Sequence, residues 1–426
     1  MAQGFETRQI HAGAVVDAQA GTRITPIYQS AGYVFDSFDD AEARFAGGGD
    51  RLVYSRHSNP TNAVVERRIA DLEGGSGALL TGSGQAAIFS TLYSLASAGD
   101  HILATASLYE GTKQLFRNNL ARQGLQFTFV DAEADDDEWA RSFTPRTKAV
   151  YTETIPNPKN DVPDLERLAR IAHAAGVPLV VDNTVATPYL NRPIEWGADI
   201  VIHSTSKWLA GHGSVIGGAV VDAGRFDWAA HPEKFPQLHA VPRPGVRSFV
   251  EVYGTRAFLP FALTVVNDYG PTVPPTSSFL LLAGIETLSL RLERHVANAQ
   301  RVAEWLEAHP DVVSVDYPGL PSSPWHERAQ RLLPKGSGSV LAFEPRGGRD
   351  AARTLLDSLR LVSQMTHIGD VRSLAIHTGS TIHGRLSEAD RLALGITPGL
   401  IRLSVGLETV DDIIADLDQA LRLAHA

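Results

Sequence analysis

The sequence Ala198-Asp199-Ile200-Val201-Ile202-His203-Ser204-Thr205-Ser206-Lys207 runs from an apolar segment of strand length into hydroxyl side chains and a lysine. Gly211-His212-Gly213 follows closely. An amine at the end of a buried strand suits Schiff-base chemistry, because burial or a nearby positive group lowers its pKa. The hydroxyls before it can hold a phosphate. This segment therefore predicts a reactive lysine at a sheet edge.

A surface lysine at a strand end is the alternative for Lys207, and for an arbitrary lysine it is the commoner outcome. The chain has only six lysines, against thirty-two arginines. The other five lie on a polar helix pattern, next to a strand, or beside prolines and glycines in loops: Lys113, Lys148, Lys159, Lys234 and Lys335. This contrast favours a chemical role for Lys207.

Short apolar runs alternate with helical patterns on either side of this segment. Strands are predicted at 77–81, 101–105, 126–130, 149–154, 177–181, 199–203 and 218–221, and helices at 85–98, 111–123 and 164–175. Such alternation predicts an α/β fold with a mostly parallel, doubly wound sheet. One long helical pattern at 279–308 precedes further strands at 312–315, 340–343 and 401–405 and helices at 350–360 and 409–423.

The length of 426 residues suits two domains. Residues 1–60 have weak periodicity and include Gly47-Gly48-Gly49, so we predict an extended N-terminal arm. Residues 61–275 form the predicted large domain, in which the proline- and aromatic-rich part 225–275 is an insertion or connector. Residues 276–426 form a predicted small α/β C-terminal domain.

Composition limits the partners and the compartment. The formal charge of −10 disfavours nucleic acid, which requires a basic surface. The absence of cysteine excludes disulfides, thiolate metal sites and cysteine nucleophiles. The longest uncharged apolar stretch, 279–285, is too short to cross a bilayer, and no secretory signal is visible at the start. We expect a cytoplasmic protein with no metal and no membrane partner.

A glycine-rich segment, Gly82-Ser83-Gly84-Gln85-Ala86-Ala87, lies at a predicted strand-to-helix junction. Free backbone amides and the helix dipole favour a phosphate there. The segment also fits the G-x-G-x-x-A dinucleotide fingerprint, which needs an acidic residue at the end of the second strand. That strand ends in Thr105-Ala106-Ser107, so the dinucleotide interpretation fails. A tight turn that binds no ligand remains an alternative interpretation of this segment.

Asp182 follows a buried strand about one crossover unit before Lys207, so both residues would emerge at the same sheet edge. An aspartate behind the ring and a lysine at the aldehyde are the two protein groups that pyridoxal phosphate requires. A helix cap is an equally good interpretation of Asp182 alone. Tyr109, at the next strand-to-helix junction, could stack on the pyridine or simply pack.

Several segments together resemble the cysteine/methionine-metabolism family of fold-type I pyridoxal-phosphate enzymes, across nearly the whole chain. They are Tyr54-Ser55-Arg56, Ser83-Gly84-Gln85-Ala86-Ala87, Tyr109-Glu110-Gly111-Thr112, Val181-Asp182-Asn183-Thr184, residues 203–213 and residues 402–408. A finer resemblance, to the O-acetylhomoserine sulfhydrylase branch, rests on residues 153–159, Phe226-Asp227-Trp228 and residues 317–324.

The resemblance implies a role for each matching residue. Lys207 is the implied catalytic amine, Tyr109 stacks on the ring and assists, Thr184 lies near the other face, and Asp182 holds the ring nitrogen. The implied phosphate ligands are Ser83, Gly84, Gln85, Ser204 and Ser206, together with Tyr54 and Arg56 of the neighbouring subunit. Asn157 and Arg402 would bind the substrate. The resemblance thus implies dimers with shared active sites, usually within a homotetramer.

The implied reaction is γ-replacement on O-acetyl-L-homoserine by sulfide, or by a small thiol such as methanethiol, giving homocysteine or methionine and acetate. A γ-lyase or cystathionine γ-synthase of the same family is the nearest alternative. A protein that binds pyridoxal phosphate without turnover is an alternative from another class. The presence of Lys207 speaks against it, because such a protein need not keep an amine for proton transfer. A nicotinamide-dependent oxidoreductase is a third alternative, and it is disfavoured because the acidic residue that would bind the ribose is missing from this sequence.

Three departures from the family pattern fall in this chain. His377-Thr378-Gly379-Ser380 and His367 stand near the expected position of the substrate carboxylate, and Val185 replaces an aromatic residue. The first two bear on the identity of the substrate more than on the cofactor. For His367, an extra polar contact and a packed histidine both remain open.

Overall fold

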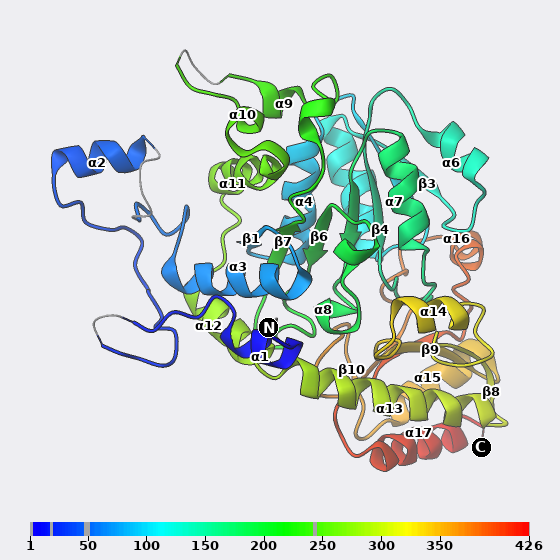
Figure 1. The fold of residues 1–426 in the computed structure, drawn as a ribbon. Coiled ribbons are helices and arrows are strands. Elements are labelled where there is room, and N and C mark those ends of the chain that lie inside the picture. The colour runs from blue at the N-terminus through cyan, green and yellow to red at the C-terminus, as the bar shows by residue number, and fades with distance from the viewer. Residues whose placement is uncertain (1–2, 18–19, 47–51, 242–244, 426) are drawn as a thin grey trace.

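A computed structural model describes residues 3–17, 20–46, 52–241 and 245–425. A seven-stranded sheet with the order β1-β7-β6-β5-β4-β2-β3 forms its centre (Figure 1). The strands are β1 (Gly77–Thr81), β2 (His101–Thr105), β3 (Gln126–Val130), β4 (Thr147–Glu153), β5 (Leu179–Asp182), β6 (Ile200–His203) and β7 (Gly218–Asp222). In this sheet the two pairs that include β7 are antiparallel and the other four pairs are parallel, so the predicted mostly parallel sheet is confirmed.

Both faces of this sheet are covered, as expected for parallel strands. Alternate side chains enter opposite apolar clusters: Val181 packs into one and Val180 into the other. The helices around the sheet include α3 (Pro60–Glu73), α4 (Gly84–Leu95), α6 (Asp136–Ser142), α7 (Leu165–Ala174) and α8 (Thr187–Leu190). The cap of α7 is Asp164, whose side chain accepts from the backbone N–H of Arg167. The helix α3 was not predicted.

Two predicted helices are broken in the structure. Residues 111–123 divide into α5 (Glu110–Gln114), a π-helical turn and a 3₁₀ turn. The helical segment as a whole ends before Gly124, as predicted. Residues 279–308 were predicted as one helix but form α12 (Pro275–Ile285) and α13 (Leu288–Ala308). At this break the carbonyl of Gly284 accepts from the Arg291 side chain at 2.7 Å. Apolar periodicity continues across the break, so it does not reveal the change in direction.

The segment 225–275 contains short helices rather than a plain connection. They are α9 (Pro236–His239), α10 (Phe249–Tyr253) and α11 (Phe258–Tyr269). Its side chains Trp228 and Phe235 are fully buried in the cluster that also contains Leu92 of α4. No single helix among the described residues is long and apolar enough to cross a membrane, although the bent pair of Phe249–Arg256 with Phe258–Tyr269 passes that test together.

A second sheet follows α13, with the order β10-β11-β12-β9-β8. Its strands are β8 (Val312–Asp316), β9 (Val340–Pro345), β10 (Ser363–Gln364), β11 (Leu374–His377) and β12 (Ile401–Ser404), and its helices are α14 (His326–Leu332), α15 (Gly348–Ser358), α16 (Glu388–Ala393) and α17 (Val410–Ala424). It has an apolar cluster of its own, which includes Phe343, Leu403 and Leu417. The exact domain limits stay predictions.

The N-terminal arm contains α1 (Phe5–His11), which lies on α3, and α2 (Phe38–Phe45), which projects away from the body (Figure 1). Gly47-Gly48-Gly49, on which the prediction of an extended arm partly rested, lies outside the described residues. Large apolar side chains of the arm are exposed, among them Val15, Ile24, Val34, Phe38 and Phe45.

Candidate active site

A pocket of about 410 Å³ opens at the carboxyl ends of β4, β5 and β6. Both the first sheet and the C-terminal part contribute to it, since Lys207 and Asp182 line it together with His367 and Arg402. Ligands of open parallel sheets bind at this edge. The sequence predictions for Ser83, Gly84, Gln85, Tyr109, Asn157, Thr184, Ser204 and Ser206 also converge here, because all of these residues line the same pocket.

The start of α4 forms one end of the pocket. The hydroxyl of Ser83 accepts from the N–H of Ala86 at 3.1 Å. The backbone N–H groups of Gly84 and Gln85 lie in the first turn of the helix, where no carbonyl of the same helix can accept from them. A Cβ on Gly84 would lie 2.6 Å from the Cβ of Ser204, so only glycine lets the two segments approach this closely. Backbone donors and a serine hydroxyl thus meet at one point, which fits a phosphate.

Asp182 lies at the floor of the pocket. Its Oδ1 accepts from the N–H and the hydroxyl of Thr184, at 3.0 and 2.5 Å, and the same hydroxyl accepts from the N–H of Ser204 at 2.8 Å. Burial raises the pKa of the Asp182 carboxyl, and the bonds from Thr184 lower it. A carboxylate in this position is stabilised by a cation, and the protonated nitrogen of a pyridine ring fits.

Tyr109 is held at the pocket by Glu153, a residue for which no role was predicted. Its backbone N–H donates to Oε1 of Glu153 at 2.7 Å, and a Cβ on Gly111 would lie 2.4 Å from the Tyr109 ring. Glu153 ends β4 directly beside Asp182. The position of Glu153 at the carboxyl end of a predicted strand was the sequence signal that could have identified it as a site residue.

Arg402 lies on β12 and is only 2% exposed. Its guanidinium donates to Oδ1 of Asn157 at 3.1 Å and to the carbonyl of Thr366 at 2.7 Å, and no carboxylate pairs with it among the described residues. Burial lowers the pKa of Arg402 to about 10. A buried guanidinium without an anion is costly. The α-carboxylate of an amino acid would complete it through charge-assisted bonds.

The amine of Lys207 lies 3.1 Å from Nδ1 of His367. Burial, followed by the charge of Arg402, lowers the pKa of Lys207 to about 8 from the ordinary 10.5. At neutral pH a larger fraction of this amine is therefore unprotonated than of a surface lysine. Only the unprotonated amine can attack an aldehyde or take a proton.

This shift predicts how the cofactor-free chain captures pyridoxal phosphate. The rate should rise with pH as Lys207 loses its proton, with a midpoint near 8 rather than near that of an ordinary lysine. Stopped-flow absorbance in the visible range would measure it. A rate that continues to rise as steeply up to pH 10 would contradict the shift.

Two predicted residues lie elsewhere. Tyr54 is 43% exposed and Arg56 donates to the carbonyl of Asn267 at 2.6 Å, and neither lines the pocket of its own chain. Their role toward a neighbouring subunit stays a prediction. Of the departures from the family pattern, Val185 lines the pocket, whereas His377 bonds to Ser380 at 2.7 Å outside it.

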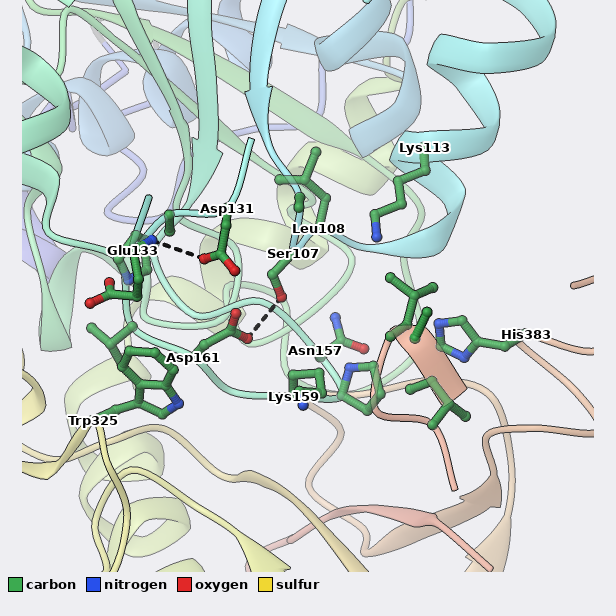
Figure 2. Close-up of a pocket in the computed structure, with 18 residues that line it drawn as sticks. Ser107, Leu108, Lys113, Asp131, Glu133, Asn157, Lys159, Asp161, Trp325 and His383 are labelled. Atoms are coloured by element: carbon green, nitrogen blue, oxygen red, sulfur yellow. Dashed lines mark hydrogen bonds between the residues drawn. The ribbon is translucent and has the colours of Figure 1, made fainter. Parts of the chain in front are cut away.

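Burial alone does not distinguish Lys207 from the other lysines, because Lys113 and Lys148 are buried whereas Lys207 is half-buried. Lys113 points into a second pocket of about 280 Å³ (Figure 2). There Ser107 donates to Asp161 at 2.8 Å, and Asn157 lines both pockets. Lys207 differs in facing the pocket that also contains Asp182 and Arg402.

Comparisons with known proteins agree with this geometry. The family model described as Cys/Met metabolism PLP-dependent enzyme, where PLP is pyridoxal phosphate, matches residues 6–422. Homocysteine synthase of Schizosaccharomyces pombe is 46% identical over 99% of this chain and 98% of its own length. O-acetyl-L-homoserine sulfhydrylase of Corynebacterium glutamicum is 45% identical over 97% and 96%.

A solved structure of a putative O-acetylhomoserine (thiol)-lyase from Campylobacter jejuni contains a pyridoxyl-lysine monophosphate. It superposes on 99% of this chain and 100% of its own with a TM-score of 0.92 at 35% identity. A family match over nearly the full length, relatives above 40% identity and a pocket suited to the cofactor lead to one conclusion. This chain belongs to the Cys/Met metabolism family of PLP-dependent enzymes, of fold type I.

Proposed function

We propose that this enzyme catalyses γ-replacement, in which O-acetyl-L-homoserine and hydrogen sulfide give L-homocysteine and acetate. The C–O bond at the γ-carbon breaks, a C–S bond forms there, and no oxidant or reductant is needed. The names of the relatives at 46% and 45% identity support this reaction. The observation that carries it is the placement around one pocket of Lys207, Asp182 and Arg402, which has no carboxylate partner among the described residues.

Each residue has a task in this reaction. Bound pyridoxal phosphate supplies an electron sink for the amino acid attached to it. Arg402 would bind the α-carboxylate. The Lys207 amine would remove the α-proton, return that proton to the substrate–cofactor pair, and so be unprotonated again when it removes the β-proton. Asp182 keeps the ring nitrogen protonated. Tyr109 would cover the ring of the bound cofactor.

The donor can also be a small thiol. Methanethiol at the same position would give methionine, and the same carbon–sulfur bond would form. A γ-lyase would instead release 2-oxobutyrate and ammonia without any donor, and a cystathionine γ-synthase would use cysteine.

A single product analysis separates these reactions. The purified enzyme, loaded with pyridoxal phosphate, is mixed with O-acetyl- or O-succinyl-homoserine, with sulfide, methanethiol, cysteine or no donor, and the products are identified by mass. We expect homocysteine from acetylhomoserine and sulfide. Products of 2-oxobutyrate and ammonia without a donor, or cystathionine alone with cysteine, would refute the proposal.

Replacing Arg402 by glutamine should raise KM for the amino-acid substrate about 100-fold. Two bonds from a charged donor are lost, each worth about 1.5 kcal/mol, and 1.4 kcal/mol corresponds to a factor of ten. Initial rates over a wide range of acetylhomoserine concentrations would measure it. Arg353→Gln is the matched control, since Arg353 is 82% exposed on α15. Equal KM values for Arg402→Gln and Arg353→Gln would contradict the assigned role.

The proposal extends to the assembly. We place Tyr54 and Arg56 at the phosphate of a neighbouring subunit, within a homotetramer built from dimers. The exposed apolar side chains of the arm, including Val34 and Phe38, support burial against another copy. Cytoplasmic location remains a prediction from the sequence.

A further inference from the structure

His367 is the imidazole that contacts the reactive amine. It lies 160 positions from Lys207 in the chain, yet its Nδ1 is 3.1 Å from Nζ. The same residue reaches the carboxylate-binding site through its backbone, because its carbonyl lies 3.3 Å from Nη2 of Arg402. One residue thus touches both the proton-transfer group and the substrate-binding guanidinium.

The surroundings of the ring keep it neutral. The charged groups that face it are Lys207, Asp370 and Arg402. Burial first, and then Lys207, lowers the pKa of His367 to about 4, while Asp370 opposes this. Above pH 5 the ring is therefore an uncharged imidazole, whose Nδ1 can accept from an ammonium or donate to an amine.

The other ring nitrogen does not compete for this contact. Nε2 of His367 is buried without a hydrogen-bond partner among the described residues. Turning the ring by half a rotation would break its bond to Lys207. The hydrogen bond between Nδ1 and Nζ therefore determines the orientation of the His367 ring and also the position of the Lys207 amine.

We infer that His367 is a positioning residue for Lys207: its Nδ1 holds the ε-amine beside the substrate whenever the lysine is not bonded to the cofactor. This inference rests on the proposed use of Lys207 as the proton-transfer amine. After Lys207 has taken a proton, the same nitrogen accepts a hydrogen bond from the ammonium. The amine therefore stays near the α- and β-carbons between the two proton transfers.

A consequence can be measured without turnover. A hydrogen-bond acceptor favours the charged form of an amine, so its loss should make Lys207 easier to deprotonate. In the cofactor-free full-length protein, labelling of Lys207 by an amine-reactive reagent, followed by peptide mass mapping, gives the pH midpoint of its deprotonation. We expect His367→Phe to lower this midpoint by roughly one pH unit, a tenfold change in the proton equilibrium.

Two variants separate positioning from packing. His367→Phe retains a ring but has no acceptor, whereas His367→Asn places an amide oxygen where Nδ1 lies. In the holoenzyme we expect the Phe variant to lose about tenfold in kcat, with KM changed less than about threefold. The Asn variant should restore most of kcat and of the labelling midpoint. His326→Phe, on α14 and outside the pocket, controls for loss of a histidine.

The outcomes are distinguishable. An unchanged midpoint and kcat in His367→Phe would overturn the inference, and so would an Asn variant as impaired as the Phe variant. If wild-type enzyme makes no homocysteine, the proposed function fails, while the labelling midpoints still decide whether His367 holds Lys207.

Discussion

Replacement of Lys207 by alanine should remove the visible absorbance of the lysine-bonded cofactor and lower kcat at least about 1000-fold. The variant loses the covalent attachment to pyridoxal phosphate and also the amine that moves the α- and β-protons. Positioned proton transfer alone contributes about 10² to 10⁴ in rate. Absorbance spectra and homocysteine production under saturating acetylhomoserine and sulfide measure the two losses separately.

Lys335→Ala is the matched control for this experiment. Lys335 lies 4.0 Å from the centre of the Tyr189 ring, outside the active-site pocket, so its loss leaves both readouts unchanged. A Lys207→Ala enzyme that keeps its absorbance and its rate would show that another amine carries the chemistry.

Asp182→Asn should lower kcat by about 10²- to 10³-fold. The amide has nearly the shape of the carboxylate and can keep the bond from Thr184, but it carries no charge to hold the ring nitrogen protonated. Removal of one preorganised electrostatic group from an active site typically costs this much. Steady-state kinetics measures the loss, and equilibrium dialysis against pyridoxal phosphate measures the accompanying loss in cofactor affinity.

Asp182→Glu tests whether charge or shape is responsible. A carboxylate one methylene longer keeps the charge and should recover part of kcat, despite its displaced position. Equal rates for the wild type and Asp182→Asn would mean that the ring nitrogen is not held by this side chain.

The sequence predicted that Asp182 and Lys207 lie in one pocket, because the direction of parallel strands determines where the residues after them lie. Asp182 ends β5 and Ser204–Lys207 follows the end of β6, so the two parallel strands place both groups at one edge of the sheet. The prediction of a phosphate site used the same logic, since the helix after β1 begins at that edge. The assignments of Arg402 and Asn157 came from the family resemblance, and the structure brings these two side chains together at 3.1 Å.

The contacts that sequence could not predict join distant parts of the chain. His367 was left undecided between a polar contact and a packed histidine, because nothing local indicates that it meets an amine on the first sheet. Glu153 gained its role from the position of the Tyr109 backbone. Burial of Lys113 likewise depends on tertiary packing, since its helical pattern is polar.

Borohydride reduction of the holoenzyme, followed by peptide mapping, tests most directly whether pyridoxal phosphate is bonded to the lysine after β6. Reduction converts the cofactor–lysine bond into a stable amine, so its position among the six lysines can be read by mass. We expect the phosphopyridoxyl group on the peptide that contains Lys207 and on no other. Its presence on the peptide of Lys113, a buried lysine that lines the second pocket with Asn157, with Lys207 unmodified, would contradict the account.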